Sequence, residues 1–132
     1  MKTFIKILHW LPRIICILAI LFISLFAADS FAPGLSIWQQ LAGFIIHLIP
    51  SFILLAILII SWKRELLGGI LFTAIGIVLT PFIFSMNYKM NHSIGISLLV
   101  IATITIPFIV VGVLFLLSYF FKKKNLKTTH NE

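Results

Sequence analysis

The chain has 132 residues, of which 61% are hydrophobic and 10% are charged, and its formal net charge is +7. An ordinary soluble domain has roughly 45–50% apolar and about 25% charged residues. This composition therefore excludes a soluble globule, and the length leaves no room for a separate soluble catalytic domain. The net charge does not point to nucleic acid as a partner, because the basic residues flank apolar runs, where anionic lipid headgroups account for them better.

Four apolar runs follow one another along the chain, at residues 14–32, 41–62, 66–86 and 94–121. Each is near or above the roughly 18 residues that indicate a membrane-spanning helix, and lipid offers the backbone no hydrogen-bond partner. We therefore predict an all-α integral membrane protein, a single-domain antiparallel four-helix bundle with a basic cytoplasmic tail at 122–132. We expect the first run to be retained as a span, not removed as a signal peptide.

Ahead of the first span, Lys2, Lys6, His9 and Arg13 are separated by four, three and four positions. This spacing is typical of a short basic helix that lies on the inner leaflet until Pro12 redirects the chain. A positively charged flank that only sets the topology is the simpler interpretation. Both interpretations place this segment on the cytoplasmic side.

The orientation of the spans follows from the distribution of Lys and Arg. Nine of the ten lie in the two tails and in the connection between the second and third spans, and only Lys89 lies in the other two loops. Positive charge concentrates on the cytoplasmic side, so both termini are predicted to be cytoplasmic. We expect a multi-pass protein of the bacterial cytoplasmic (inner) membrane, with anionic headgroups around its cytoplasmic end. Aromatic anchors fall at the predicted span ends: Trp10, Trp38, Trp62, Tyr88 and Tyr119.

The second span contains the one ionisable side chain well inside an apolar run, His47. Gly43 and Ser51 lie four positions on either side of it, and Pro50 frees a backbone carbonyl nearby. Asp29, near the outer end of the first span, lies toward the same membrane face. Either these residues form a proton or ligand site, or His47 makes one structural hydrogen bond between helices. The predicted site comprises five residues: Asp29, Gln40, His47, Ser51 and His92.

Small residues recur at helical spacing in three spans and indicate close helix packing. A homodimer seam is the alternative interpretation, and the sequence does not separate the two. The positions are Gly43, Gly69, Thr73, Gly76, Thr80 and Gly112.

The sequence holds no pattern typical of nucleophilic catalysis, of a metal site or of a phosphate-binding loop. We therefore expect no enzyme, no cofactor and no metal. Two functions remain. One is a structural or accessory membrane protein that acts through helix contacts with a second copy or with another membrane protein. The alternative is a small oligomeric transporter or channel that uses an outer-leaflet polar site around His47 and Asp29.

Several segments of the chain are similar to those of a family of small bacterial four-span membrane proteins of unknown function. The segments at the second and third spans are residues 47–52 (HLIPSF), 62–66 (WKREL) and 68–72 (GGILF). Residues 27–31 (AADSF) match the end of that family's first span, and residues 114–124 match its last span and basic tail. The first loop departs from the family, which commonly has Trp followed by Glu where this chain has Trp38-Gln39. The resemblance implies the four-span topology and implies no activity.

Overall fold

The structure, a computed structural model, describes residues 2–129, and these residues are helical except for short connections. Within them, four stretches are long and apolar enough to cross a membrane: Thr3–Ser30, Ile37–Lys63, Glu65–Asn91 and Ile94–Thr128. The prediction of an all-α, multi-pass protein with four packed spans is confirmed. In chain order the elements are α1 (Lys2–Leu25), the 3₁₀ helix η1 (Phe26–Ser30), α2 (Ile37–Lys63), α3 (Glu65–Asn91), α4 (Ile94–Ile104) and α5 (Ile106–Thr129).

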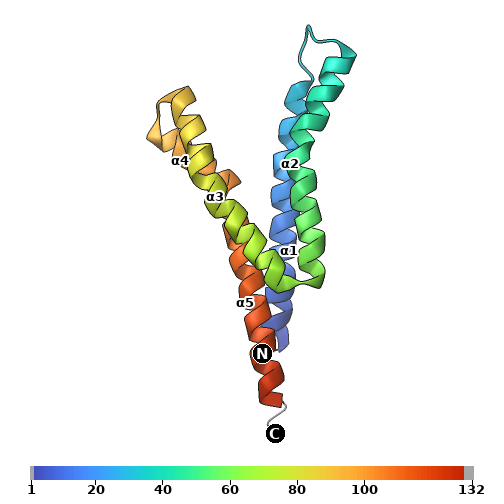
Figure 1. The fold of residues 1–132 in the computed structure, drawn as a ribbon, viewed down its shortest axis with the longest axis vertical. Helices are drawn as coiled ribbons and strands as arrows, with labels where there is room; N and C mark the ends of the chain where they lie inside the picture. Colours follow the sequence, from blue (N-terminus) through green and yellow to red (C-terminus); the bar gives the residue numbers. More distant parts are fainter. Residues whose placement is uncertain (1, 130–132) are drawn as a thin grey trace.

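The helices form two antiparallel hairpins that together make a V (Figure 1). The first hairpin consists of α1 and α2, and the second consists of α3 followed by α4 and α5. At the closed end of the V, α1 packs on α5 and α2 packs on α3. This end, where both termini and Arg64 lie, is called the terminal end, and the opposite one, with the connections at 31–36 and 92–93, is called the loop end.

Local hydrogen bonds explain where α2 begins and where α3 gives way to α4. Ser36 Oγ accepts from the Gln39 amide at 3.3 Å, and Gln39 Oε1 accepts from the Ser36 amide at 3.0 Å, which makes a capping box. His92 ends α3 in the left-handed conformation, with φ 51°. Ser93 then caps α4 by accepting from the Ile96 amide at 3.3 Å.

The fourth span is broken at Thr105, between α4 and α5. Pro107 lacks a backbone N–H, so the regular helical hydrogen-bond ladder cannot continue through it. The Phe108 amide instead donates to the Thr105 carbonyl at 3.1 Å, a tighter turn than that of an α-helix. The fourth span is therefore divided into two helices next to Pro107.

The first and last described segments continue the helices of the neighbouring spans. α1 begins at Lys2 and runs unbroken through Pro12, so the basic segment continues the first span and is not a separate helix. At the other end α5 reaches Thr129, and most of the predicted tail at 122–132 is helical, while residues 130–132 lie outside the described part. Packing of α1 against α5 explains both extensions, because each terminal helix gives the other a partner.

The buried core lies in the half of the molecule near the terminal end. Its centre is Phe72 of α3, whose ring lies parallel to those of Phe108 and Phe115 of α5, with centroids 6.1 and 6.2 Å away. α1 contributes Cys16 and Ile20, and α2 adds Leu54 and Leu58 to the same cluster.

Glycines allow α3 and α5 to approach closely. A Cβ atom on Gly69 would lie 2.9 Å from the Gly112 carbonyl oxygen, and one on Gly112 would lie 2.5 Å from the Thr73 amide nitrogen. Only residues without a side chain fit at these two positions. A Cβ on Gly76 would collide with the side chain of Ile109. Small residues at this helix interface replace the hydrophobic driving force that lipid does not supply.

Candidate functional site

One carboxylate, that of Glu65, collects side chains from three helices at the terminal end. Glu65 is the first residue of α3, and its side chain is 10% exposed. Its Oε1 accepts from Lys122 Nζ of α5 at 2.7 Å and from Arg13 Nη2 of α1 at 3.1 Å. Its Oε2 accepts from Ser118 Oγ at 3.1 Å. We call Glu65, His9, Arg13, Ser118 and Lys122 the Glu65 cluster.

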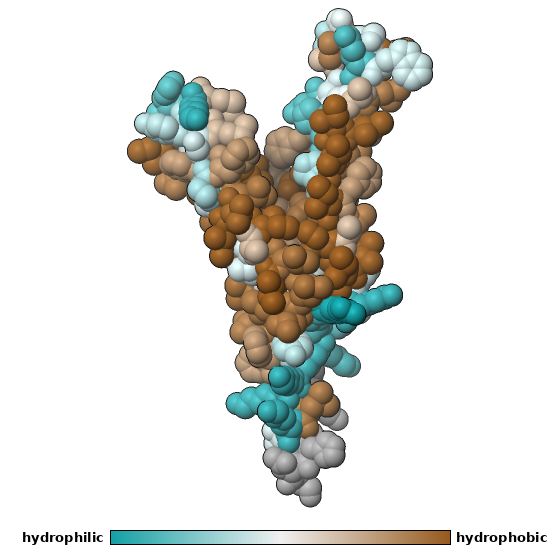
Figure 2. Space-filling view, viewed as in Figure 1, coloured by the Kyte–Doolittle hydropathy of each residue, from teal (hydrophilic) through white to brown (hydrophobic). Residues whose placement is uncertain are grey.

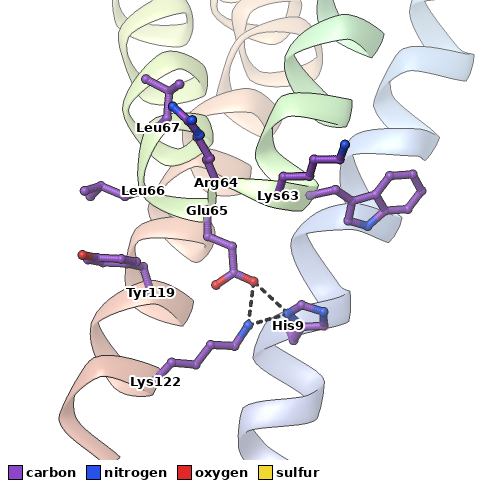
Figure 3. A pocket seen from close by; sticks show the side chains of 9 residues that line it. His9, Lys63, Arg64, Glu65, Leu66, Leu67, Tyr119 and Lys122 are labelled. Atoms are coloured by element: carbon purple, nitrogen blue, oxygen red, sulfur yellow. Dashed lines mark hydrogen bonds and ion pairs between the residues drawn. The ribbon is translucent and has the colours of Figure 1, made fainter. Parts of the chain in front are cut away.

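His9 completes the cluster through a single nitrogen atom. Its Nδ1 lies 2.7 Å from Glu65 Oε1 and also 2.7 Å from Lys122 Nζ (Figure 3). A protonated Nδ1 donates to the carboxylate, whereas an unprotonated Nδ1 accepts from the ammonium group. The two arrangements exclude each other, so the proton on His9 decides whether Glu65 has two or three N–H donors beside it.

Arg13 is the most deeply buried charged residue among those that the structure describes, with 1% of its surface exposed. Its guanidinium lies 5.4 Å from the centroid of the Phe115 ring and also donates to the His9 carbonyl oxygen. Its Nε has no hydrogen-bond partner within residues 2–129. A buried cation is tolerated only when an opposite charge compensates it, and here Glu65 supplies that charge.

A cavity of about 550 Å³ opens beside the cluster. Figure 3 shows its lining, in which Lys122 and His9 reach toward Glu65 while Lys63 and Arg64 extend from the link between α2 and α3 away from the Glu65 carboxylate. Lys63 and Arg64 form no ion pair within the described part of the chain. We call this space the basic cavity; it is lined by His9, residues 62–67, Tyr119 and Lys122.

A second cavity, of about 640 Å³, lies between the two hairpins. Its lining is almost wholly apolar and comes from both arms of the V, for example Ile53 of α2 together with Val78 and Phe82 of α3. Figure 2 shows the corresponding hydrophobic surface along the arms, with hydrophilic residues gathered at the terminal end and at the tips. We call this space the apolar cleft.

The five residues of the sequence-predicted ligand or proton site do not form one cluster. His47 Nδ1 lies 2.8 Å from the Gly43 carbonyl and 3.2 Å from Ser30 Oγ, so its contacts stay within the first hairpin. Asp29 is exposed and forms no ion pair within residues 2–129. Gln40 donates to the carbonyl oxygens of Ala32 and Leu35.

The remaining two predicted site residues lie apart from His47. Ser51 is buried and accepts from Ser24 Oγ at 3.0 Å, which joins α2 to α1. His92 belongs to the second hairpin, at the tip of the other arm of the V. Its ring contacts Tyr88, with centroids 6.2 Å apart.

The predicted packing residues lie at helix contacts. Thr80 Oγ1 donates to Thr105 Oγ1 at 2.9 Å, which links α3 to the break between α4 and α5. Gly43 faces Ser30, whose Oγ would lie 3.3 Å from an added Cβ. Thr73 lies against Gly112, and its buried Oγ1 has no hydrogen-bond partner in the described residues.

Comparison with known proteins decides the family and leaves the activity open. A family described as a domain of unknown function (DUF7670) matches residues 1–127. The chain belongs to this family. No curated protein and no solved structure matches it. Within residues 2–129, no group of three or more His, Cys, Asp and Glu side chains is placed to hold a metal ion.

Sequence reasoning missed the Glu65 cluster in this member of the family. Its partners are 52 to 57 positions from Glu65, so no local spacing reveals them. The chain did hold a usable signal. Glu65 follows the short link between two spans, and the positive residues of both tails lie at the same end. One acid among so many bases attracts the nearest of them.

Proposed function

We propose that the protein is a non-enzymatic structural or accessory component of the bacterial cytoplasmic membrane that acts through helix–helix contacts. The observation that carries this proposal is the apolar cleft. It gathers exposed apolar side chains from both hairpins at membrane depth, and it includes Ala74, an exposed small residue that allows close approach. A transmembrane helix, from a second copy or from another membrane protein, is the occupant that this surface suits.

The polar side chains of the spans support a packing role over a transport role. Ser24 bonds to Ser51, Ser30 lies against His47, and Thr80 bonds to Thr105. Each pair joins neighbouring helical segments. Side chains that satisfy one another in this way hold helices together and do not line a path for a solute.

We further propose that both termini are cytoplasmic and that anionic headgroups surround the terminal end. The support is the sequence distribution of Lys and Arg, nine of which belong to the tails and to the link at Lys63 and Arg64. Anionic lipids of the inner leaflet attract such segments by about 1 kcal/mol per cation.

Site-specific photo-crosslinking in native membranes tests the proposed helix contact. A photoreactive amino acid at Val78 lies in the apolar cleft, whereas one at the neighbouring Ile77 does not, although the two residues are exposed by 68% and 58%. We expect a defined protein adduct, a second copy or one membrane partner identified by mass spectrometry, from Val78 and not from Ile77. Adducts in equal amounts from both positions, or from neither, would contradict the proposal.

A further inference from the structure

The basic cavity has more positive charge than its one carboxylate can compensate. Its lining includes three cations, Lys63, Arg64 and Lys122, and Arg13 donates to Glu65 from α1. Both oxygens of Glu65 are already engaged inside the cluster, whereas Lys63 and Arg64 are exposed and form no ion pair within residues 2–129. An anion that enters this cavity therefore meets cations whose charge no carboxylate has neutralised.

The backbone adds hydrogen-bond donors to the same cavity. The cavity is lined by the first three residues of α3, Glu65, Leu66 and Leu67, whose N–H groups have no acceptor within the helix. No side chain caps this turn among the described residues. These N–H groups are hydrogen-bond donors for an anion, while the partial charge of the α3 start is offset by the end of α2, which lines the same cavity.

The aromatic lining fixes the depth of the cavity in the membrane. Trp62 and Tyr119 lie at its wall, and such residues concentrate at the level of the lipid headgroups. Leu66 and Leu67 provide an apolar side to the same space. A lipid has both parts that this lining suits, a phosphate for the cations and a glycerol and acyl region for the leucines, whereas a soluble phosphate has only the first.

We propose that the basic cavity binds the phosphate of an anionic lipid headgroup, attracted by the cations that line it, Lys63, Arg64 and Lys122. This site gives one bound lipid a fixed place between the link of the two hairpins and α5. The proposal rests on the proposed membrane placement of the terminal end. It is independent of the helix contact at the apolar cleft, because the two sites share no lining residue.

Lipid retention by the purified full chain tests the proposal. The protein is equilibrated with equal amounts of dioleoylphosphatidylglycerol and dioleoylphosphatidylcholine, and native mass spectrometry counts the lipid that each protein molecule retains. The test variant is Lys63→Gln/Arg64→Gln, which leaves every contact of the Glu65 cluster in place. The matched control is Lys124→Gln/Lys127→Gln, which removes the same charge from two exposed lysines outside the cavity. Circular dichroism confirms that the three proteins have the same helix content.

We expect the wild type and the control to prefer the anionic lipid. The preference of the test variant should fall by about tenfold or more, because it lacks two cations and each attracts the lipid phosphate with a free energy close to that of a tenfold change in affinity. Equal retention of the two lipids by the wild type would overturn the proposal. A loss in the control as large as that in the test variant would also overturn it, because it would show a general effect of net charge and not a site.

Inorganic phosphate separates the lipid from a soluble source of the same chemistry. We expect that an excess of inorganic phosphate leaves the preference for the anionic lipid unchanged. If phosphate displaces the lipid and raises the melting temperature of the wild type but not of Lys63→Gln/Arg64→Gln, the cavity takes a soluble phosphate compound and the lipid assignment is wrong. Crosslinking at Val78 tests the apolar cleft. A negative crosslinking result would therefore contradict the proposed helix contact and would not affect the lipid-binding result.

Discussion

The two ends of the molecule are held by different forces. At the terminal end, one carboxylate joins α1, α3 and α5 and compensates a buried arginine. At the loop end, the polar contacts of Ser30, Gln40 and Asn91 each stay within one hairpin, and the two arms diverge. The difference shows what joins hairpins in lipid. Apolar side chains contact lipid as readily as one another, so charges, hydrogen bonds and close backbone packing decide where helices stay together.

The largest effect is expected from Glu65→Gln, which removes the negative charge at the terminal end. Arg13 would remain buried without a counter-charge, so we expect a loss of about 3 kcal/mol in the free energy of unfolding, the lower part of the range for breaking a buried ion pair. Lys122 and His9 are about one-third exposed, so water still solvates them when the carboxylate is gone. Their contribution to the loss of stability is therefore small. Unfolding in mixed micelles measures the loss.

Asp29→Asn is the matched control for this substitution, because it makes the same chemical change at the loop end. Asp29 is exposed and unpaired within residues 2–129, so the expected change lies within about 0.5 kcal/mol. Equal losses in the two variants would show that the terminal end has no special role.

The next effect concerns the close packing of α3 on α5. In Gly112→Ala the new methyl group would press on Thr73 and on the Gly69 carbonyl, and we expect a loss of about 2 kcal/mol. Gly95→Ala is the comparison, since its Cβ would lie no closer than 3.9 Å to the Ser93 hydroxyl. Alanine there is expected to be neutral or to stabilise α4 by up to about 1 kcal/mol. Thermal melts of both variants check the sign of each change.

A smaller effect is expected where one hydrogen bond links helices. Thr80→Val removes the bond to Thr105 and keeps the side-chain shape, and we expect a loss of about 0.6 kcal/mol, the average for such bonds in membranes. Thr103→Val is the control, because Thr103 Oγ1 bonds only to carbonyls of its own helix. If Thr103→Val costs as much as Thr80→Val, the bond between helices adds nothing to the second hairpin.

The smallest effect is expected from His47→Ala. His47 is exposed and its contacts stay within the first hairpin, so the free energy of unfolding should change by less than about 0.5 kcal/mol. Reconstituted vesicles provide the functional measurement. A pH-dependent flux of solute through the wild type that is lost in His47→Ala would contradict the proposed packing role and establish the transport alternative.

The architecture is readable from the sequence because it depends on run length alone. Apolar runs separated by short links allow little besides packed antiparallel helices. The arrangement of side chains is not readable in the same way. His9 and Lys122 are 113 positions apart and meet only because α1 packs on α5. Depth in the membrane suggested that His47 and His92 share a site, but depth does not reveal which hairpin a residue belongs to.

Pulsed electron paramagnetic resonance on the protein in lipid nanodiscs tests the central claim, that the hairpins are joined at the terminal end and apart at the loop end. One label pair, Ile7 with Phe120, reports the terminal end, and a second pair, Gln39 with Met90, reports the loop end. All four residues are exposed. The buried Cys16 is replaced by alanine in both variants, so that only the introduced cysteines carry labels. We predict a short, narrow distance distribution at the terminal end that broadens in Glu65→Gln, and a long one at the loop end. Equally short distances at both ends, unchanged in Glu65→Gln, would contradict the account.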